Sequence, residues 1–347
     1  MDVRYSEEQH ALRDAAARLV GQLGPHAVGD LGDPERRAKL DAAVAASGWR
    51  ELRAPAEGGT PMASGVEAAI VAEELGRGLA DVAFFGPVMA GELRRLAGAP
   101  DPAALETVAF LDDLSTVART GDGSGLPPMV AVDAAGSSTA LLLVSRTDGG
   151  HLAQVELGGV RAGIDLTRPS MAIDPTVDVS AVEPAVRPVA PDSLQRWTAL
   201  GLSLTCADLV GTMRGAVQLA TEYASERRQY GVAIGSFQAI QHLLADAFVQ
   251  AEGAHSVTLH AAWAVDELPA ADALEAAAVA KAYCARAARV VCETAIQVHG
   301  GIGNTWECSA HLYLRRALLS GELLGGAGAS MARVLGHRGI GGVDGLP

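Results

Sequence analysis

Several features that mark other protein classes are absent from this sequence of 347 residues. Its four cysteines, Cys206, Cys284, Cys292 and Cys308, form no Cys-x-x-Cys pair, so neither a zinc knuckle nor a redox dithiol is indicated. We expect buried free thiols in a reducing compartment. No apolar run reaches the roughly 18 residues of a membrane span. The N-terminal segment is too charged for a signal peptide, which predicts a cytoplasmic protein.

Positive charge and aromatic side chains are also in short supply. The net charge is −14 and no block of Lys or Arg stands out, so we expect neither a nucleic acid nor a membrane as partner. Aromatic residues make up 4% of the chain and hydrophobic residues 49%, mostly as the helix formers Ala and Leu. The composition predicts a mostly helical globular protein, and the length predicts about two to three domains.

The first part of the chain has a helical hydrophobic pattern. Apolar residues recur at intervals of three and four in the segments 6–22, 35–47, 66–75 and 88–96. Ser6 is a suitable N-cap for the first of these helices, and Gln9 stands at the reciprocal position of a capping box. Residues 1–103 are therefore predicted to form a helical domain.

The pattern changes after residue 103. Short apolar runs separated by Gly, Ser and Asp predict strands in a small sheet or barrel. The runs are TVAFL at 107–111, MVAVD at 129–133, TALLLVS at 139–145, LAQVELGGV at 152–160 and PTVDVS at 175–180. Residues 104–190 are predicted to form a truncated β domain.

From residue 191 the helical pattern returns. The spacing predicts three helices through Leu202, Cys206, Leu209, Met213, Ala216 and Ala220; through Phe237, Ile240, Leu244, Phe248 and Ala251; and through Val279, Tyr283, Ala287 and Val290. A fourth helix is predicted from Trp306 to about Leu324. Residues 191–347 are thus predicted to form a four-helix bundle. The whole chain is predicted to be mainly α with a small β domain, an α+β fold.

Two segments of the predicted bundle suggest a ligand site. ERRQYGVAIGSFQAIQHLLAD (226–246) has two arginines at the end of one helix, and QVHGGIGNTWE (297–307) has a double glycine between helices. Glycine lets a backbone approach a ligand closely, and free amides beside an arginine suit a pyrophosphate. A purely structural role for arginines at a helix C-terminus is the alternative. No metal-binding spacing is present, so no metal site is predicted.

These two segments resemble the C-terminal signature of the acyl-CoA dehydrogenase family. YSEEQHALRDAAARLV, GWRELRAPAEGG and AEELGRGL resemble the family's N-terminal helical domain in order and spacing. The resemblance extends over nearly the whole chain and is weakest at 101–190. It implies a helical–β–helical fold and FAD-dependent oxidation of an acyl-CoA thioester to a 2,3-enoyl-CoA. In that reaction a carboxylate removes the α-proton and the flavin accepts a hydride.

The resemblance also implies contacts with FAD. In this family the flavin lies at a subunit interface, and each subunit reaches the ADP side of its neighbour's FAD. The contacts that carry over to this chain are Arg227, Gln229, Tyr230, Phe237, Gln238, Gln297, Gly300 and Gly301. Tyr230 stands where phenylalanine is usual.

The chain departs from the family where the catalytic base is expected. The family segment that contains Tyr-Glu-Gly-Thr reads RRALLSGELLGG over 315–326, which places Leu324 at the glutamate. Glu322 precedes it by two residues, about 200° away around a helix. The other family position for the base corresponds to Gln195 of the pair Gln195–Arg196. Neither Leu nor Gln can accept a proton in this reaction, so no catalytic residue is assigned.

The family's Thr-Glu-Pro-like segment and the side chains that grip the flavin ring have no counterpart in 107–125. A chain with contacts for a neighbour's FAD, but without a base or a ring grip, can complete a partner's site. We expect the short subunit of an α2β2 acyl-CoA dehydrogenase, similar to those of actinobacterial sterol degradation. Its partner would be a larger homologous subunit, with FAD shared at the interface and an electron-transfer flavoprotein as acceptor. Two alternatives stay open: a self-sufficient dehydrogenase with Glu322 or a middle-domain Asp as base, and a non-enzymatic scaffold.

Overall fold

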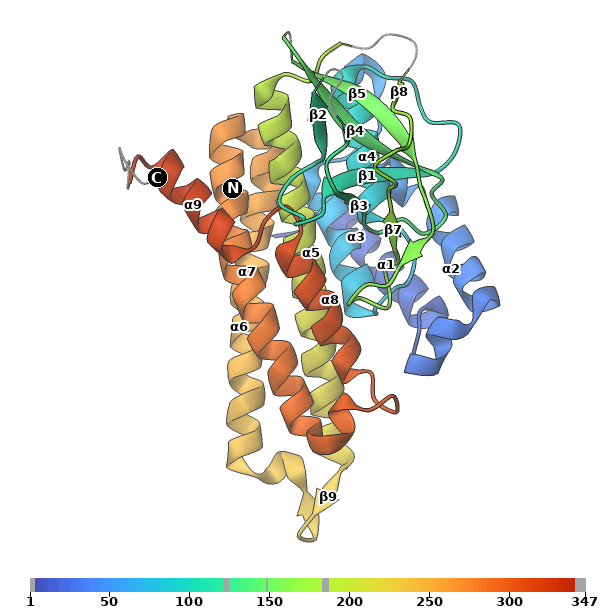
Figure 1. The fold of residues 1–347 in the computed structure, drawn as a ribbon. Helices are drawn as coiled ribbons and strands as arrows, with labels where there is room; N and C mark the ends of the chain where they lie inside the picture. The colour runs from blue at the N-terminus through green and yellow to red at the C-terminus, as the bar shows by residue number, and fades with distance from the viewer. Residues whose placement is uncertain (1–3, 122–124, 148, 183–186, 341–347) are drawn as a thin grey trace.

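The computed structural model describes residues 4–121, 125–147, 149–182 and 187–340. A group of helices, a small sheet and a second group of longer helices follow one another along the chain (Figure 1). This order confirms the predicted fold class, mainly α with a small β domain. The domain boundaries after residues 103 and 190 stay predictions.

The N-terminal part consists of α-helices joined by 3-10 turns. Its helices are α1 (Glu7–Leu23), α2 (Pro34–Ala46), α3 (Gly65–Arg77) and α4 (Phe85–Ala97), with η1 (Val28–Gly32), η2 (Trp49–Glu51) and η3 (Glu57–Gly59) between them. The capping box predicted for α1 is confirmed: the Ser6 amide donates to the Gln9 side chain at 3.0 Å, and the Gln9 amide donates to the Ser6 hydroxyl at 3.2 Å. The capping box thereby satisfies two of the amides at the start of the helix that have no partner within it.

The strands form a mixed sheet. They are β1 (Glu106–Leu111), β2 (Arg119–Gly121), β3 (Met129–Ala131), β4 (Thr139–Arg146), β5 (Gly149–Glu156), β6 (Val160–Arg161), β7 (Ser170–Ala172) and β8 (Ser180–Ala181). Their order is β6-β7-β3-β1-β4-β5-β8, and β2 pairs with β4. β1 and β2 run parallel to β4, whereas β4 and β5 form a long antiparallel hairpin.

The C-terminal part is built on three long helices. Its elements are α5 (Pro191–Glu226), β9 (Arg228–Gln229), β10 (Val232–Ala233), η4 (Ile234–Ser236), α6 (Gln238–Glu267), α7 (Ala270–His299), η5 (Gly300–Asn304), α8 (Ala310–Glu322) and α9 (Ala327–His337). The predicted start of the fourth helix near Trp306 is wrong, because α8 begins at Ala310 and has 13 residues. The Thr305 hydroxyl and the Cys308 sulfur accept the amides of Glu307 and Ala310, which closes turns where a helix was predicted.

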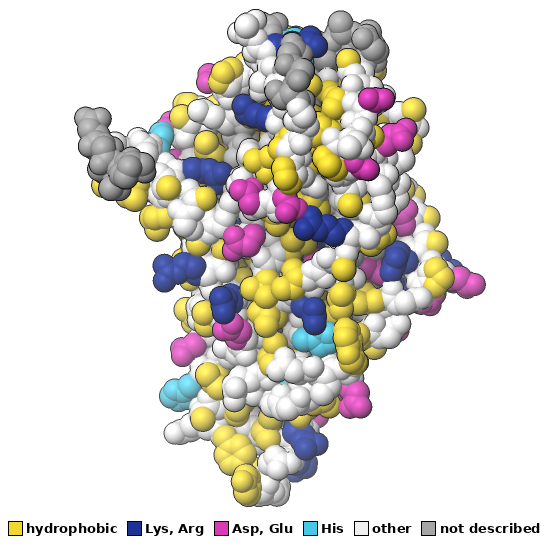
Figure 2. Space-filling view, viewed as in Figure 1, with side chains coloured by type: hydrophobic (Ala, Val, Ile, Leu, Met, Phe, Trp, Pro, Cys, Tyr) yellow, Lys and Arg dark blue, Asp and Glu magenta, His cyan; other side chains and the backbone are white. Residues whose placement is uncertain are grey.

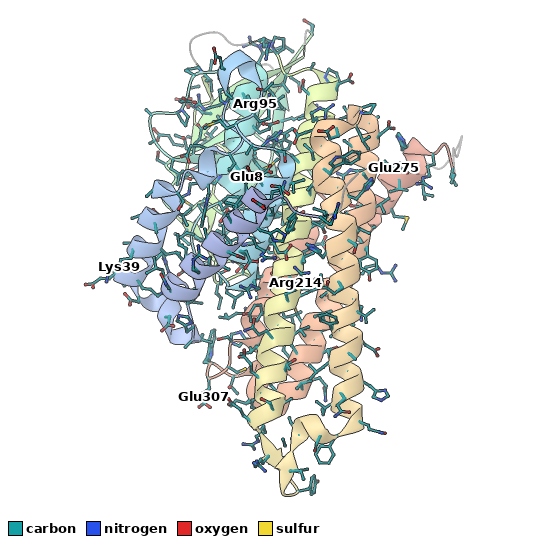
Figure 3. The ribbon with its side chains drawn as sticks, turned by 180° about the vertical axis from the view of Figure 1, so that it is seen from behind. Glu8, Lys39, Arg95, Arg214, Glu275 and Glu307 are labelled. Atoms are coloured by element: carbon teal, nitrogen blue, oxygen red, sulfur yellow. The ribbon has the colours of Figure 1, made fainter. Side chains whose placement is uncertain are left out.

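Helix α5 lies at the centre of the molecule (Figure 1). It packs against α3, α6, α7 and α8, and its predicted apolar positions between Leu202 and Ala220 are all buried. In the middle of α5, Arg214 contacts Glu73 of α3 and Glu252 of α6 (Figure 3). The N-terminal helices and the bundle are therefore held together by ion pairs as well as by apolar packing.

The apolar faces predicted for α6 and α7 are only partly buried. Ala251 and Ala287 lie in the core, whereas Phe248 is 57%, Tyr283 41% and Val290 47% exposed. Alanines line the buried sides of these helices instead, because small side chains let helices approach closely. The larger outward-facing side chains, which we call the α6–α7 apolar set, are Leu243, Phe248, Val249, Val279, Tyr283 and Val290.

Two further findings concern the thiols and the membrane. All four cysteines are free and buried, as predicted. Cys284 of α7 lies 3.4 Å from the Thr258 hydroxyl of α6, so this thiol is part of the helix packing. Within the described ranges, none of the helices is long and apolar enough to cross a membrane.

Candidate functional site

The eight residues that the resemblance assigns to FAD lie together at one end of the bundle. Three segments supply them: the end of α5 with β9, η4 with the start of α6, and the end of α7 with η5 (Figure 1). All eight residues are exposed, and we call them the distal surface. In Figure 2, hydrophobic and basic side chains gather at this tip of the molecule.

Contacts within the chain hold the backbone of the distal surface in place. The Arg227 carbonyl accepts a backbone amide of η4 at 2.8 Å. The ring of Tyr230 lies edge-on to Phe237 with 6.4 Å between centroids, although Tyr230 is 95% exposed. Tyr223 of α5 stacks on His299 of α7 at 4.5 Å. The ends of α5 and α7 are thereby joined, and the three segments form one surface.

The distal surface offers donors that the chain itself does not use. Within the described residues, no hydrogen bond or ion pair engages the side chains of Arg227, Gln229, Gln238 and Gln297. The N-cap of α6 is Phe237, which provides no side-chain cap, and the first turn contains no acid. A helix N-terminus favours negative charge. This donor set fits the pyrophosphate and ribose oxygens of a dinucleotide such as FAD.

The double glycine leaves the backbone of this surface open. Gly300 has φ 64° and ψ −142°, a conformation that other residues rarely adopt. Gly301 adopts an ordinary conformation, and a Cβ there would meet no atom of the described residues within 4 Å. The fold therefore requires glycine at 300 but not at 301. The open backbone at 301 leaves room for a molecule that approaches from outside, such as a dinucleotide.

Leu324, at the family's glutamate position, is buried. It has no exposed area and a φ of 62°. A Cβ added to Gly201 of α5 would lie 2.3 Å from Leu324 Cδ1 and 2.8 Å from Met89 Cε, so Leu324 fills the space between α4 and α5. Glu322 is exposed, and its carboxylate lies against Gly326. The two side chains thus have different surroundings.

Gln195, at the other base position, lines a cavity of about 470 Å³ between the sheet and the start of α5. The following residue, Arg196, donates to the carbonyls of Val265 and Leu268 and so fixes the start of α5 to the end of α6. No carboxylate is found among the described residues that line this cavity. Neither family position therefore presents a base.

A buried ion-pair network, which sequence reasoning missed, joins the sheet to the bundle. Arg316 of α8 donates to Asp208 of α5 at 2.7 and 2.9 Å. Arg168 pairs with Asp165 at 2.8 Å and with Asp208 at 3.3 Å, and the Ser320 hydroxyl donates to Asp208 at 2.6 Å. Burial opposes ionisation of Asp208, but the guanidinium groups of Arg168 and Arg316 outweigh it and hold the pKa of Asp208 below its usual range.

The sequence contains one signal for this network. Arg316 stands at the aspartate of the family's Arg-Asp-Ala segment. An arginine in place of an aspartate on a buried helix face needs an acidic side chain nearby, because a buried charge needs a partner of opposite sign. The chain supplies that acid as Asp208.

Asp133 lies beside this network in an unusual environment. Its Oδ2 accepts the amides of Phe84 at 2.8 Å and Gly86 at 3.2 Å, whereas its buried Oδ1 has no partner. Burial raises the pKa of this carboxyl group. The cavity that Asp133 lines measures about 20 Å³, which is room for about one water molecule. This junction has no room for a flavin ring or an acyl chain.

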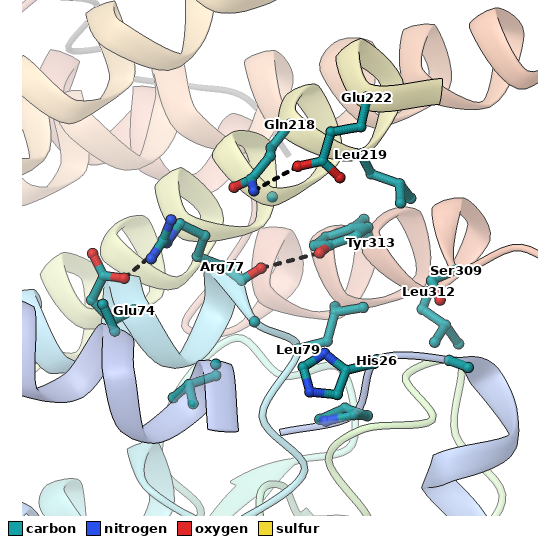
Figure 4. A pocket seen from close by; sticks show the side chains of 17 residues that line it. His26, Glu74, Arg77, Leu79, Gln218, Leu219, Glu222, Ser309, Leu312 and Tyr313 are labelled. Atoms are coloured by element: carbon teal, nitrogen blue, oxygen red, sulfur yellow. Dashed lines mark hydrogen bonds and ion pairs between the residues drawn. The ribbon is translucent and has the colours of Figure 1, made fainter. Parts of the chain in front are cut away.

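Another cavity, of about 230 Å³, lies between α1, α3, α5 and α8 (Figure 4). Its polar groups pair with one another. Arg77 donates to Glu74 at 2.8 Å, Gln218 donates to Glu222 at 2.9 Å, and the Tyr313 hydroxyl donates to the Arg77 carbonyl at 3.1 Å. None of the predicted site residues lines this cavity, and we assign it no function.

Comparison with known proteins establishes the family. Residues 202–340 match the family model of the acyl-CoA dehydrogenase C-terminal domain. The chain is 32% identical to acyl-CoA dehydrogenase IpdE2 of Mycobacterium tuberculosis (strain ATCC 25618 / H37Rv) over 326 residues, which cover 92% of this chain and 93% of the relative. The chain therefore belongs to the acyl-CoA dehydrogenase family. IpdE2 of Mycolicibacterium smegmatis is 29% identical, over 92% of this chain and 95% of that protein.

Solved structures confirm the fold. The Tcur3481-Tcur3483 steroid ACAD G363A variant aligns with a TM-score of 0.79 and 22% identity, over 96% of this chain and 98% of that one. The ChsE4-ChsE5 complex from Mycobacterium tuberculosis aligns with a TM-score of 0.77 and 22% identity, over 98% and 99%. PigA with FAD and proline aligns with a TM-score of 0.76 and 17% identity, over 99% and 100%. At these identities the likeness concerns the fold.

Proposed function

We propose that this chain is the non-catalytic subunit of a heteromeric, FAD-dependent acyl-CoA dehydrogenase. It completes the FAD site of a larger homologous subunit in an α2β2 assembly that desaturates an acyl-CoA thioester between C2 and C3. One observation carries the proposal: Leu324 is buried at the position of the family base, whereas the donors of the distal surface are exposed and have no partners among the described residues.

The side chains of the distal surface would hold the ADP side of the partner's FAD. Arg227 would pair with the pyrophosphate, and the first-turn amides of α6 would add favourable dipoles. Gln229, Gln238 and Gln297 would donate to ribose or phosphate oxygens. When bound, FAD would supply the acceptor for the hydride that leaves the β-carbon of the thioester.

Removal of the α-proton requires a base, because this C–H group is weakly acidic. Leu324 and Gln195 cannot accept the proton, so the base has to come from the partner subunit. The printed descriptions of two similar structures name pairs of components, Tcur3481-Tcur3483 and ChsE4-ChsE5. These descriptions support a two-component assembly for this chain as well.

Expression of the chain with and without a homologous subunit that retains the glutamate tests the proposal. We expect the isolated chain to lack stoichiometric FAD. The co-purified complex is expected to hold one FAD per heterodimer, and acyl-CoA should reduce this flavin. Stoichiometric FAD and acyl-CoA-dependent bleaching in the isolated chain would contradict the proposal. A complex that forms but holds no flavin would indicate the scaffold alternative.

A bulky, steroid-type CoA thioester is the proposed substrate, with an electron-transfer flavoprotein as acceptor. The steroid description of one similar structure supports this choice. Turnover of the complex should be higher with a steroid-derived CoA thioester than with a straight-chain acyl-CoA of similar length. The opposite order of kcat/KM values would exclude the steroid assignment and leave the subunit role intact.

A self-sufficient dehydrogenase is the second candidate, and the environment of Asp133 favours it. A buried carboxylate with a raised pKa and an unpaired oxygen is a typical general base. The cavity of about 20 Å³ beside it argues against this role. The variants Asp133→Asn and Glu322→Gln separate the candidates, because complete loss of turnover in either one would place the base in this chain.

A further inference from the structure

The cavity of about 470 Å³ beside Gln195 is lined by basic side chains, although the chain as a whole is acidic. Arg119 of β2, Arg146 of β4 and Arg333 of α9 all line it, together with the polar side chains of Gln195 and Thr198. The described lining contains no Asp or Glu, although the chain has 41 acidic and 27 basic residues. We call this cavity the arginine pocket.

The guanidinium group of Arg333 lacks an acidic partner. Its buried Nη1 makes no hydrogen bond, and both Nη atoms lie 3.5 Å from the position of a Cβ at Gly325. In the described part of the chain, no ion pair engages Arg333 or Arg119. Arginine stays charged at any physiological pH. A half-buried cation that the fold leaves unpaired is stabilised when an external anion reaches it.

We propose that the arginine pocket binds a small organic anion that carries phosphate or carboxylate oxygens. Guanidinium groups bind both kinds of oxygen in a bidentate manner. The Gln195 amide supplies a neutral donor for a remaining oxygen of the ligand, whereas the Thr198 hydroxyl already donates to the Leu194 carbonyl at 2.8 Å. The described lining offers no general base, so the pocket holds its ligand without converting it. This site uses neither the distal surface nor bound FAD.

Isothermal titration of the full-length chain at low ionic strength tests the site, with pyrophosphate and succinate as separate probes. We expect saturable binding of at least one probe at a site separate from the distal surface, and the two titrations show whether phosphate or carboxylate is preferred. Arg333→Gln and Arg119→Gln should each weaken binding at least tenfold. Because the Arg119 side chain is exposed, Arg119→Gln should fold normally, and it tests the site even if Arg333→Gln fails to fold.

Arg289→Gln is the matched control, because Arg289 is an exposed arginine of α7 that pairs with Glu293 at 2.9 Å. Its affinity for the probes should equal that of the unaltered chain. An equal loss of affinity in Arg289→Gln would show a non-specific charge effect and overturn the proposal. Absence of saturable binding of both probes, or unchanged affinity in Arg119→Gln, would overturn it as well.

Discussion

Asp208 is the acceptor on which the buried network depends. It accepts from Arg316 and Ser320 and pairs with Arg168. Asp208→Asn removes the negative charge and leaves two buried guanidinium groups under-compensated. We expect the free energy of unfolding to fall by about 3–5 kcal/mol, measured by urea denaturation. The control Asp174→Asn, at an exposed carboxylate, should leave the free energy of unfolding nearly unchanged.

The same residue predicts a pH dependence. The pKa of Asp208 is lower in the folded chain than in the unfolded chain, so the folded state binds its proton more weakly. Its contribution to stability is complete above the unfolded value of about 3.9 and is lost as the pH falls through the folded pKa. Urea midpoints measured between pH 7 and pH 3 should decline less steeply in Asp208→Asn than in the unaltered chain. Equal slopes would contradict this assignment.

The two glycines of the distal surface allow stability and binding to be separated. Gly300→Ala should cost about 1–3 kcal/mol of stability, because alanine is strained at φ 64°. Gly301→Ala should leave the stability of the isolated chain unchanged, because its Cβ lies more than 4 Å from the rest of the described structure. In the complex, the added methyl group should weaken FAD retention several-fold. Normal FAD content in the Gly301→Ala complex would remove this glycine from the cofactor site.

Helix α5 crosses α3 so closely that Gly211 has no room for a side chain. A Cβ added to Gly211 would lie 1.8 Å from the Glu73 carbonyl oxygen and 2.7 Å from the Arg77 amide nitrogen. Gly211→Ala must push the two helices apart, at a cost of about 1–3 kcal/mol or more. Gly21→Ala in α1 is the matched control, since no atom lies within 4 Å of its Cβ. It should stabilise the chain by about 0.5–1 kcal/mol, so thermal melting should show shifts of opposite sign.

Some helices and strands can be predicted from neighbouring residues in the sequence, and others cannot. The Ser6–Gln9 capping box predicts the start of α1 because the interaction involves neighbouring residues only. β2 and β7 have three residues each, which is too short for an alternating pattern. The apolar spacing on α6 identifies a helix, but it cannot show that Phe248 faces outward while Ala247 is buried. That choice depends on how closely the neighbouring helices approach.

The candidate site, too, could be predicted from the sequence only in part. The motif around Arg227 and the double glycine at Gly300 predict which residues form the distal surface, because the motifs are contiguous. The ion pairs of Asp208 and the arginine pocket bring together residues from distant segments. Arg119 and Arg333 are separated by most of the chain, and no local pattern indicates that they line one cavity. They come together because the sheet, the start of α5 and α9 border the same cavity.

The α6–α7 apolar set gives the assembly its most direct test. Phe248 is 57% exposed on α6 and Tyr283 41% on α7, and burial of such side chains yields about 25 cal/mol per Å² of apolar area removed from water. Since the proposed function requires a partner subunit, we expect these side chains to be covered in the complex. Phe248→Asp places a charge on this face and should disrupt co-purification with the larger subunit.

Met62→Asp is the matched control, because Met62 is 65% exposed but belongs to the N-terminal part of the chain. It should leave the complex intact in size-exclusion chromatography. Both variants should keep the helical circular dichroism of the isolated chain, since neither side chain belongs to the core. If Phe248→Asp also assembles normally and retains FAD, the outward face of α6 does not contribute to the subunit contact. Joint loss of the partner and of FAD would instead link assembly through this helix to the cofactor site at its N-terminal end.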